Sequence, residues 1–303
     1  MAKYISIDIG GTSIKYGVID DFVRILRKGE TDTNAWEGGE TIVERVSGLI
    51  ETLKKDLEIS GICISTAGIV DVEKGVILHS SPLIPGYTGI CWKETLEQRF
   101  GIPCEVENDV NCAGLAEYTS GAARGTRLAL MLTVGTGIGG CLVSDGSVYH
   151  GFCGSGCEVG YMYLPGGAFQ DLGASSILTK KVAEWKKEPV SEWNGRRIFH
   201  EAKNGDELCI RAIDELVDTL GQGIANLCYI LNPEVVVLGG GIMAQEEFLK
   251  EKIQSSVKSY LIPYIAERTK IQFALHQNEA GMLGAFYHFQ NIHRNQSQVP
   301  AHN

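Results

Sequence analysis

Residues 4–19 decide the fold, and they read YISIDIGGTSIKYGVI. Apolar residues alternate at Ile5, Ile7 and Ile9, which predicts a strand with Asp8 on its opposite face. A Gly-Gly-Thr turn and a second alternating run follow Ile9. The stretch is therefore predicted to be a β-hairpin with a glycine-rich tip.

The residue types at this tip suit a phosphate ligand. Gly10 and Gly11 let the backbone approach a ligand because they have no Cβ, and a turn of this kind can direct several N–H groups at an anion. Thr12 adds a hydroxyl donor and Lys15 a cation, while Asp8 can hold Mg²⁺ through water. The competing interpretation is an ordinary hairpin whose glycines serve the turn. The carboxylate just before the turn favours a ligand, since a structural hairpin does not require it.

Composition restricts the class of protein. A chain of 303 residues predicts two domains or lobes, and 44% hydrophobic with 21% charged residues describes a soluble globular protein. The net charge of −10 argues against a nucleic-acid partner, and no apolar run is long enough to span a membrane. The first residues enter a strand at once, so no signal peptide is expected. Nine scattered cysteines are expected to be reduced thiols in a cytoplasmic protein.

The first part of the chain is predicted to alternate strands and helices. Helices are predicted at 41–57, 92–100 and 110–118, and strands after the hairpin at 23–26, 61–65 and 103–106. This order is typical of an α/β lobe.

The pattern then restarts at residue 128. A predicted strand at 128–134 runs into a glycine-rich tip at 135–140, and Thr133 stands 125 positions after Asp8. Two related lobes would explain this repeat of a strand and a glycine-rich tip. If the two tips face each other across a cleft, they would bind a phosphate chain from both sides. Two unrelated hairpins are the alternative.

The last third of the chain contains a third glycine cluster. A helix at 208–231 and a buried strand at 234–238 are predicted to precede Gly239-Gly240-Gly241, which can admit the flat ring of adenosine against the backbone. A simple tight turn would also explain these glycines. The final helix, around 278–291, carries small residues that allow close packing on a neighbour, namely Ala280, Gly281, Gly284 and Ala285.

Five motifs occur in the order found in the ROK sugar kinases, and together they cover nearly the whole chain. They are Asp8-x-Gly-Gly-Thr, Asn108-Asp109, the 135–140 tip, Glu158-Val159-Gly160 and Gly239-Gly240-Gly241. The resemblance implies a two-lobed actin-like ATPase (ribonuclease H-like) fold with a duplicated hairpin and α/β core. It implies a small N-terminal lobe at 1–118, joined by a C-terminal helix at about 286–303, and a large lobe at 119–285.

The same resemblance implies positions for the ligands. The ATP phosphates would contact the two tips, at Gly10, Gly11, Thr12, Thr136 and Gly137, with Asp8 near Mg²⁺ and adenosine beside Gly240. The sugar would meet Asn108, Asp109, Glu158 and the turn at Gly68. Asp109 is suited to accept the proton of the sugar hydroxyl, and Asn108 can both donate and accept hydrogen bonds. The alternative role for the Asn108-Asp109 pair is to cap the helix that follows.

One departure concerns zinc. Many ROK proteins have a histidine where this chain has Tyr161, followed by a cysteine-rich zinc site, but residues 161–176 contain neither Cys nor His. We therefore expect no zinc, although His150, Cys153 and Cys157 offer three ligand types before Glu158. Tyr161 is expected to loosen the sugar site around the anomeric hydroxyl, and Asp171 is the nearest match by spacing to a sugar-binding Glu. The chain resembles the zinc-less branch that includes β-glucoside kinases and glucokinases.

The resemblance implies an ATP-dependent kinase for the 6-hydroxyl of glucose, or of a glucose unit in a β-glucoside. The alternatives are an N-acetylmannosamine kinase and, from another class, a sugar-sensing regulator that has no catalytic activity. Repressors of this family carry a helix-turn-helix before the first strand, for which Asp8 leaves no space here. The expected ligands are a sugar, ATP and Mg²⁺, without nucleic acid or membrane, in a homodimer.

Overall fold

A computed structural model describes residues 1–298, which form two compact units. Within the described residues, unit 1 contains residues 1–116, 150–156 and 278–298, and unit 2 contains residues 117–149 and 157–277. Each unit is built around its own five-stranded sheet. The lobe boundaries at 118 and 285 stay a prediction.

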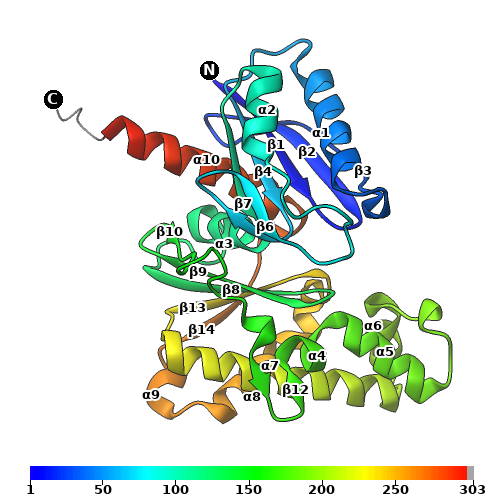
Figure 1. The fold of residues 1–303 in the computed structure, drawn as a ribbon. Coiled ribbons are helices and arrows are strands. Elements are labelled where there is room, and N and C mark those ends of the chain that lie inside the picture. The colour runs from blue at the N-terminus through cyan, green and yellow to red at the C-terminus, as the bar shows by residue number, and fades with distance from the viewer. Residues whose placement is uncertain (299–303) are drawn as a thin grey trace. The chain divides into compact units, whose positions relative to one another are not determined.

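The sheet of unit 1 has the order β3-β2-β1-β4-β7 (Figure 1). Its strands are β1 (Lys3–Ile9), β2 (Ser13–Asp20), β3 (Ile25–Asp32), β4 (Gly61–Thr66) and β7 (Cys104–Asn108). The first three run antiparallel, which confirms the predicted hairpin, and β4 and β7 continue the sheet in parallel with β1. The register places Asp8 opposite Lys15 on one side and Ser65 on the other.

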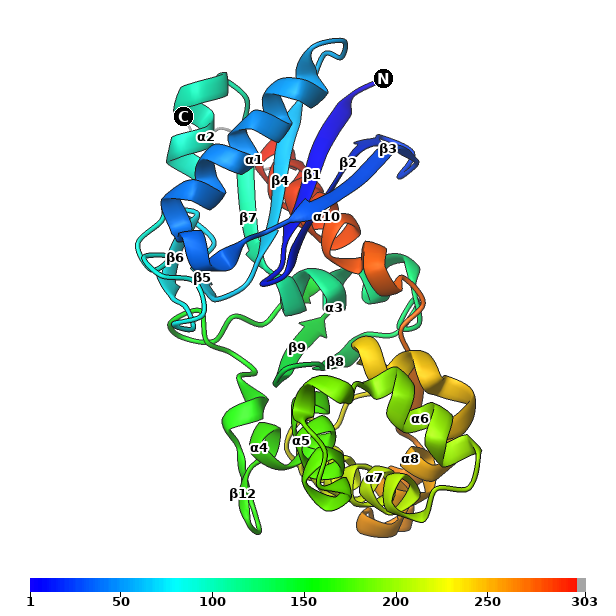
Figure 2. The ribbon, with the colours of Figure 1, turned by 90° about the vertical axis from the view of Figure 1, so that its right-hand side faces the viewer.

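The two faces of this sheet are covered by different helices (Figures 1 and 2). The isoleucines of β1 share a core with α1 (Gly39–Lys54) and α2 (Trp92–Phe100). On the other face lies α10 (Ala280–Gln298), where Ser6 Oγ donates to the carbonyl of Met282 at 2.7 Å and Tyr4 packs on Phe286. A Cβ on Gly284 would overlap the carbonyl of Cys112, so the small residues of α10 do allow close packing.

The shorter elements of the first 120 residues complete this part of the chain. A 3₁₀ turn at Ala35–Glu37 precedes α1, a small hairpin pairs β5 (Ile69–Asp71) with β6 (Val76–His79), and α3 (Asp109–Ser120) follows β7 directly.

The sheet of unit 2 repeats the arrangement of unit 1, in the order β10-β9-β8-β13-β14. Its strands are β8 (Leu128–Val134), β9 (Ile138–Ser144), β10 (Ser147–Val148), β13 (Val235–Gly239) and β14 (Lys270–Phe273). β8 is antiparallel to β9 and parallel to β13, as β1 is to β2 and β4. Thr133 pairs with Gly139 and Gly239 in the way that Asp8 pairs with Lys15 and Ser65, so the duplicated core predicted from the sequence is present.

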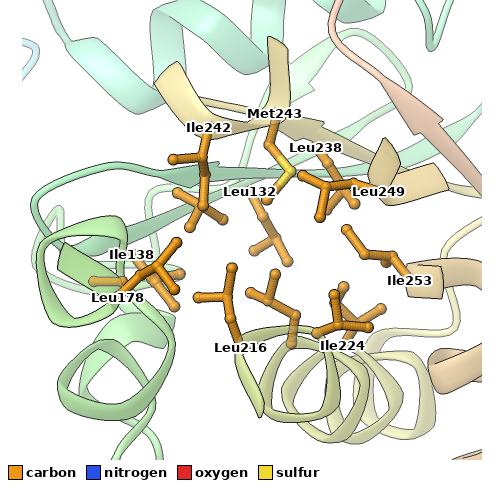
Figure 3. Packing of buried hydrophobic residues seen from close by; sticks show 14 of the residues in the cluster. Leu132, Ile138, Leu178, Leu216, Ile224, Leu238, Ile242, Met243, Leu249 and Ile253 are labelled. Carbon is orange, nitrogen blue, oxygen red and sulfur yellow. The ribbon is translucent and has the colours of Figure 1, made fainter. Parts of the chain in front are cut away.

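The long helix α7 (Glu207–Leu231) organises the core of unit 2 (Figure 3). Leu216 and Ile224 of α7 pack with Leu132 and Leu238 of the sheet and with Ile253. The other helices are α4 (Phe169–Gly173), α5 (Ser175–Lys186), α6 (Gly195–Lys203), α8 (Glu246–Tyr260) and α9 (Pro263–Ala266). A hairpin of β11 (Tyr163–Leu164) with β12 (Gly167–Ala168) and 3₁₀ turns at Val159–Tyr161, Val190–Glu192, Gly241–Gln245 and Gln277–Glu279 complete the described chain.

One predicted strand begins too early. Val23 was expected to start a strand, but it has a φ of 63° and lies in the turn between β2 and β3. Asp20 holds this turn, because its Oδ1 accepts the N–H groups of Phe22 and Arg24. Among residues 1–298, no helix has the length and apolar character needed to cross a membrane.

Candidate active site

The tip of the first hairpin, residues 10–12, is held by the end of β3. Thr33 donates its N–H to the carbonyl of Thr12 at 2.9 Å and its hydroxyl to the carbonyl of Gly10 at 2.6 Å. A Cβ on Gly11 would meet no atom within 4 Å, and the φ of Gly11 lies outside the left-handed region. The fold therefore does not require glycine there, and the missing Cβ would let an anion approach the backbone closely.

Asp8 lies just before this tip and is partly buried. Its Oδ1 accepts a hydrogen bond from Ser65 Oγ at 2.6 Å. Gly281 of α10 packs so closely against Asp8 that a Cβ on Gly281 would overlap the carboxylate. Burial raises the pKa of Asp8, and the Ser65 hydrogen bond and the charge of Lys15 oppose that rise. The ammonium group of Lys15 donates a hydrogen bond from Nζ to Asn278 Oδ1 at 3.3 Å.

The residues around Asp8 fit a magnesium ion that is held mainly by water and phosphate. In the described chain, no three His, Cys, Asp or Glu side chains are grouped so as to hold a metal ion. Mg²⁺ commonly uses only one or two protein carboxylates together with water and substrate phosphates. Asp8 beside the tip supplies one such carboxylate, and a nearby cation would also stabilise its ionised form.

The Asn108-Asp109 corner, where β7 is followed by α3, is fixed by four hydrogen bonds of the Asn108 side chain. Asn108 Nδ2 donates to the carbonyl of Gly68 at 2.9 Å and to Asp109 Oδ1 at 3.0 Å. Asn108 Oδ1 accepts the N–H groups of Val110 at 2.9 Å and Asn111 at 3.1 Å. Asn108 is thus the residue that caps α3, and the catalytic role of its neighbour Asp109 stays a prediction.

The corner and the glycine tip belong to one edge of the unit 1 sheet. The parallel register aligns Asp8, Ser65 and Glu107 in one row, and Ile9, Thr66 and Asn108 in the next. Neighbouring strands lie about 4.8 Å apart, so two strand spacings separate Asp8 from the corner, or about 10 Å. The carboxyl ends of these parallel strands are where ligands bind in open α/β sheets.

The second glycine tip, in unit 2, is held by the start of α5. The carbonyl of Gly135 accepts both the N–H of Ser175 at 2.9 Å and its hydroxyl at 2.6 Å, and Ser176 Oγ donates to the carbonyl of Thr136 at 2.7 Å. These bonds engage the carbonyls of the tip. They also bring the tip to the N-terminus of a 12-residue helix, which favours negative charge. A Cβ on Gly137 would lie 2.9 Å from Gln170 Oε1.

A cavity of about 450 Å³ opens beside the third glycine cluster. Gly240 has a φ of 101° and its Cβ would overlap the backbone of Val134, so the fold itself requires this glycine. Gly241 lines the cavity, and its Cβ would meet no atom within 4 Å. The other lining residues include Ser175, Thr179, Arg196, Phe199 and Ile242. The cavity has the size and the mixed lining of a small-ligand site.

Three of the remaining predicted sugar residues lie in unit 2. Glu158 precedes the 3₁₀ turn that ends at Tyr161, Asp171 lies on α4, and all three side chains are exposed, with Tyr161 at 64%. Gly68 in unit 1 has a φ of 103°, and its Cβ would lie 2.7 Å from the carbonyl of His79. Its glycine is therefore required by the backbone. The roles assigned to all of these residues stay predictions.

Sequence reasoning missed several residues that hold the site together. Ser65, Ser175 and Ser176 contact Asp8 or the second tip, but a lone serine carries no recognisable pattern. The signal that could have identified Ser65 is its place in the strand next to β1. His150 was considered only as a zinc ligand, whereas its Nε2 lies 2.6 Å from Glu107 Oε2.

Comparison with known proteins identifies the family of this chain. The chain matches the ROK family over residues 4–292. A β-glucoside kinase of Listeria innocua is 32% identical over 295 residues, covering 95% of this chain and 97% of the relative. A candidate N-acetylmannosamine kinase of Listeria monocytogenes has a solved structure with a TM-score of 0.86 and 31% identity, covering 96% of this chain and 99% of that one.

A third similar protein was solved with ligands. It is a ROK family glucokinase from Streptomyces griseus in complex with glucose and AMPPNP, with a TM-score of 0.82 and 26% identity, covering 94% of this chain and 98% of that one. The family match spans almost the whole chain, and the solved kinases share its two-sheet α/β architecture. The resemblance read from the motifs is confirmed: this chain belongs to the ROK family and has the actin-like ATPase fold.

Proposed function

We propose that this chain is an ATP-dependent kinase that transfers the γ-phosphate to the 6-hydroxyl of glucose, or of a glucose unit in a β-glucoside. The observation that carries the proposal lies within unit 1. A fixed carboxylate corner, Asn108-Asp109, shares one sheet edge with the open glycine tip and Asp8. A phosphoryl-transfer site needs a position for phosphates, a carboxylate near the metal and a group that receives the proton of the nucleophile.

In this proposal Asp109 accepts the proton of the attacking hydroxyl. A sugar hydroxyl is a poor nucleophile until a base within hydrogen-bond reach orients it and takes its proton. The hydrogen bonds from Asn108 Nδ2 and Val110 N hold Asp109 Oδ1 in place, which limits the rotamers of the base before the substrate arrives. Asn108 already uses both of its amide protons, so in this state its main task is to orient Asp109.

The nucleotide is assigned to three features. The tips at Gly10-Gly11-Thr12 and Thr136-Gly137 would bind phosphates, and the cavity beside Gly241 would receive the adenine ring. Asp8 would hold Mg²⁺ through water, and the ion would neutralise charge on the phosphates. The Streptomyces griseus relative, solved with AMPPNP and glucose, supports this assignment.

The choice of sugar is based on the similar proteins and on one side chain, Tyr161. Tyr161 is 64% exposed and stands where many family members have a zinc-anchored histidine, so we expect a looser site around the anomeric hydroxyl that accepts a β-linked substituent. The β-glucoside kinase of Listeria innocua supports this choice. The candidate N-acetylmannosamine kinase of Listeria monocytogenes supports the alternative. The cytoplasmic location and the homodimer stay predictions.

An ADP-release assay with glucose, cellobiose and N-acetylmannosamine tests the proposal. We expect phosphorylation of glucose and cellobiose, with kcat/KM for both at least tenfold above that for N-acetylmannosamine. Activity on N-acetylmannosamine without activity on cellobiose would replace the first candidate with the second. Tight sugar binding by calorimetry without ADP release from any of the three would favour the regulator that has no catalytic activity.

A further inference from the structure

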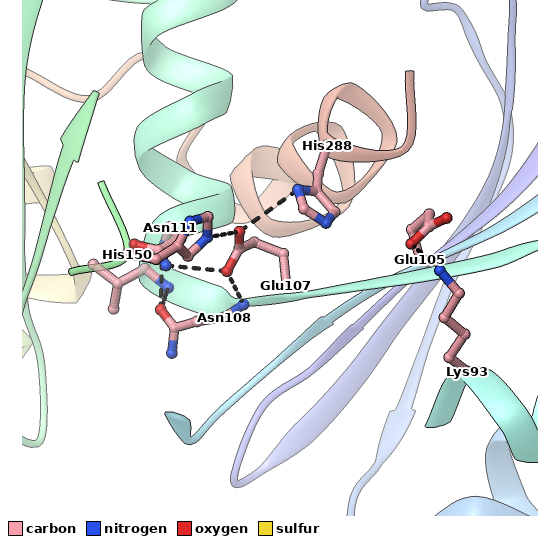
Figure 4. Close-up of polar contacts among 8 residues, drawn as sticks. Lys93, Glu105, Glu107, Asn108, Asn111, His150 and His288 are labelled. Atoms are coloured by element: carbon pink, nitrogen blue, oxygen red, sulfur yellow. Dashed lines mark hydrogen bonds and ion pairs between the residues drawn. The ribbon is translucent and has the colours of Figure 1, made fainter. Parts of the chain in front are cut away.

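Two glutamates of β7 point away from the isoleucine core and towards α10 (Figure 4). Glu105 is 2% exposed and Glu107 is fully buried. A buried carboxylate is costly unless it is paired and hydrogen-bonded, so the partners of each glutamate indicate its task.

Glu107 binds the corner that carries the proposed base. Its Oε1 accepts the backbone N–H of Asn108 at 2.7 Å and the side-chain amide of Asn111 at 3.0 Å. The backbone N–H of Asn111 in turn donates to Asn108 Oδ1, and Asn108 Nδ2 donates to Asp109 Oδ1. A chain of hydrogen bonds therefore links the Glu107 carboxylate to Asp109 through Asn111 and Asn108.

The second oxygen of Glu107 faces two histidines. His150 Nε2 lies 2.6 Å from Oε2, and His288 Nδ1 of α10 lies 3.5 Å from the same atom. His150 belongs to the 150–156 segment, which packs within unit 1: a Cβ on Gly154 would lie 3.0 Å from the carbonyl of Val70. Within the segment, the carbonyl of His150 accepts the N–H of Gly156 at 2.9 Å, so His150 is held by its own segment as well as by Glu107.

Glu107 and the two histidines have pKa values that are shifted from their ordinary values in different directions. Burial by itself raises the pKa of Glu107, but the hydrogen bonds from His150 and Asn111 and the charge of His150 oppose that rise, and the pKa lies below its usual value. The Glu107 hydrogen bond is the main cause of a raised pKa at His150, whereas burial lowers the pKa of His288. Other titratable groups near the cluster are Glu105, Lys93, Cys112 and Asp109.

Glu105 offers a natural comparison, because it is a buried carboxylate on the same strand whose ion pairs are made with other residues. Its carboxylate pairs with Lys93 Nζ at 2.8 Å and with His293 Nε2 at 3.1 Å. Glu105 therefore neutralises charge inside unit 1 through its contacts with Lys93 and His293.

We propose that Glu107 is a positioning residue for Asp109, and that His150 is the partner that keeps the Glu107 carboxylate ionised and correctly oriented. The inference rests on the proposed kinase function. In this role Glu107 never touches the substrate. It fixes the main chain at Asn108 so that Asp109 starts α3 in one orientation, and this orientation defines where the base meets the sugar hydroxyl.

The test compares Glu107→Gln with Glu105→Gln in the full chain. Both variants remove one buried charge from the same strand, so both are expected to lower the melting temperature. Only Glu107→Gln is expected to reduce kcat/KM for the sugar, by at least tenfold, and to speed amide hydrogen exchange in the 104–114 segment. The NMR titration of the His150 ring should also move towards about 6.5, the ordinary value for histidine.

The proposal is overturned if Glu107→Gln keeps kcat/KM within twofold of the wild type and exchanges no faster at 104–114 than Glu105→Gln. Hydrogen exchange needs no substrate, so it judges Glu107 even if the wild type phosphorylates no sugar, an outcome that would contradict the proposed function alone. If Glu107→Gln does not fold, His150→Gln takes its place. Since the carboxylate remains in that variant, we expect a smaller loss of kcat/KM, about threefold, and an unchanged kcat/KM would remove His150 from the proposal.

Discussion

Ser65 Oγ donates a 2.6 Å hydrogen bond to Asp8 Oδ1 across the parallel pairing of β1 and β4. The two residues are register partners, so the sheet itself brings the hydroxyl to the carboxylate. A hydrogen bond to an ionised group is stronger than one between neutral groups, and it favours the charged form. In a partly buried site where burial raises the pKa of Asp8, this hydroxyl supports the form that a magnesium ion needs.

Ser65→Ala is expected to lower kcat/KM for magnesium ATP by about tenfold, since hydrogen bonds to charged groups contribute about 1.5–3 kcal/mol. The Ser65 bond lowers the pKa of Asp8, so its removal raises that pKa further. Activity that depends on ionised Asp8 falls as pH falls through this pKa, and the acid limb of the pH profile should move to higher pH in the variant. Ser6→Ala is the control, because Ser6 lies on β1, the strand of Asp8, and its hydroxyl donates to the carbonyl of Met282 in α10. Equal profiles for the two variants would contradict the role of Ser65.

Asp109→Asn keeps the shape of the side chain and an oxygen that can accept from Asn108 Nδ2 and Val110 N. The charge needed for proton transfer is lost, so kcat should fall by about 10²–10⁴-fold. Sugar Kd from calorimetry and the melting temperature should change far less, because Asn108 provides the cap of α3. Near-normal kcat with a lowered melting temperature would leave Asp109 with a structural role only.

Gly281→Ala places a methyl group against the Asp8 carboxylate, where no space exists. Overpacking of this kind typically costs about 1–3 kcal/mol, so both the free energy of unfolding and kcat/KM should decrease. Gly48→Ala is a matched control in α1, since its Cβ would meet no atom within 4 Å. That change should stabilise the protein by about 0.5–1 kcal/mol and leave kcat/KM unaltered. Urea unfolding and steady-state kinetics on both variants measure the contrast. Full activity in Gly281→Ala would show that Asp8 tolerates displacement.

Gly241→Val fills part of the 450 Å³ cavity, and its Cβ meets no atom within 4 Å at a φ outside the left-handed region. We expect Kd for AMPPNP to rise at least tenfold in calorimetry, while Kd for glucose and the melting temperature stay close to those of the wild type. Unchanged AMPPNP affinity would place the adenine ring elsewhere.

Metal analysis of the purified protein is expected to find far less than one zinc per chain. Tyr161 replaces the family histidine, no Cys or His occurs in residues 161–176, and His150 is engaged by Glu107. Treatment with EDTA followed by added Mg²⁺ should abolish and then restore ADP release, whereas added Zn²⁺ should not. One tightly held zinc ion per chain, retained through EDTA treatment, would contradict the prediction.

The sequence predicts best those features that depend on a local pattern of apolar and polar residues. Strict alternation at Ile5, Ile7 and Ile9 gave the hairpin and the face of Asp8, and β8 (Leu128–Val134) was predicted at its observed bounds. The edge strand β3 was placed poorly, because it is largely polar from Arg27 to Asp32 and has no apolar alternation to recognise. Its first predicted residue, Val23, adopts a left-handed turn that a β-branched residue rarely takes.

The part of the site that the sequence could not predict depends on long-range pairing. Glu107 and His150 are 43 positions apart, and Ser65 and Asp8 are 57 positions apart. Which strands become neighbours, and in which register, decides these contacts, and no local pattern encodes that choice. The glycines illustrate the same limit, since Gly240 and Gly241 look alike in the sequence but only Gly240 is demanded by the backbone.

The return of α10 to the sheet of unit 1 has a consequence for biosynthesis. On the ribosome, the first 116 residues emerge long before the helix at Ala280–Gln298 that covers one face of their sheet. Until then Tyr4, Ser6, Glu105 and Glu107 lack the contacts that α10 supplies. Unit 1 therefore completes its fold only after α10 has been synthesised, whereas the sequence of unit 2 is already complete at Gln277. The unit whose synthesis begins first is the one that finishes folding last.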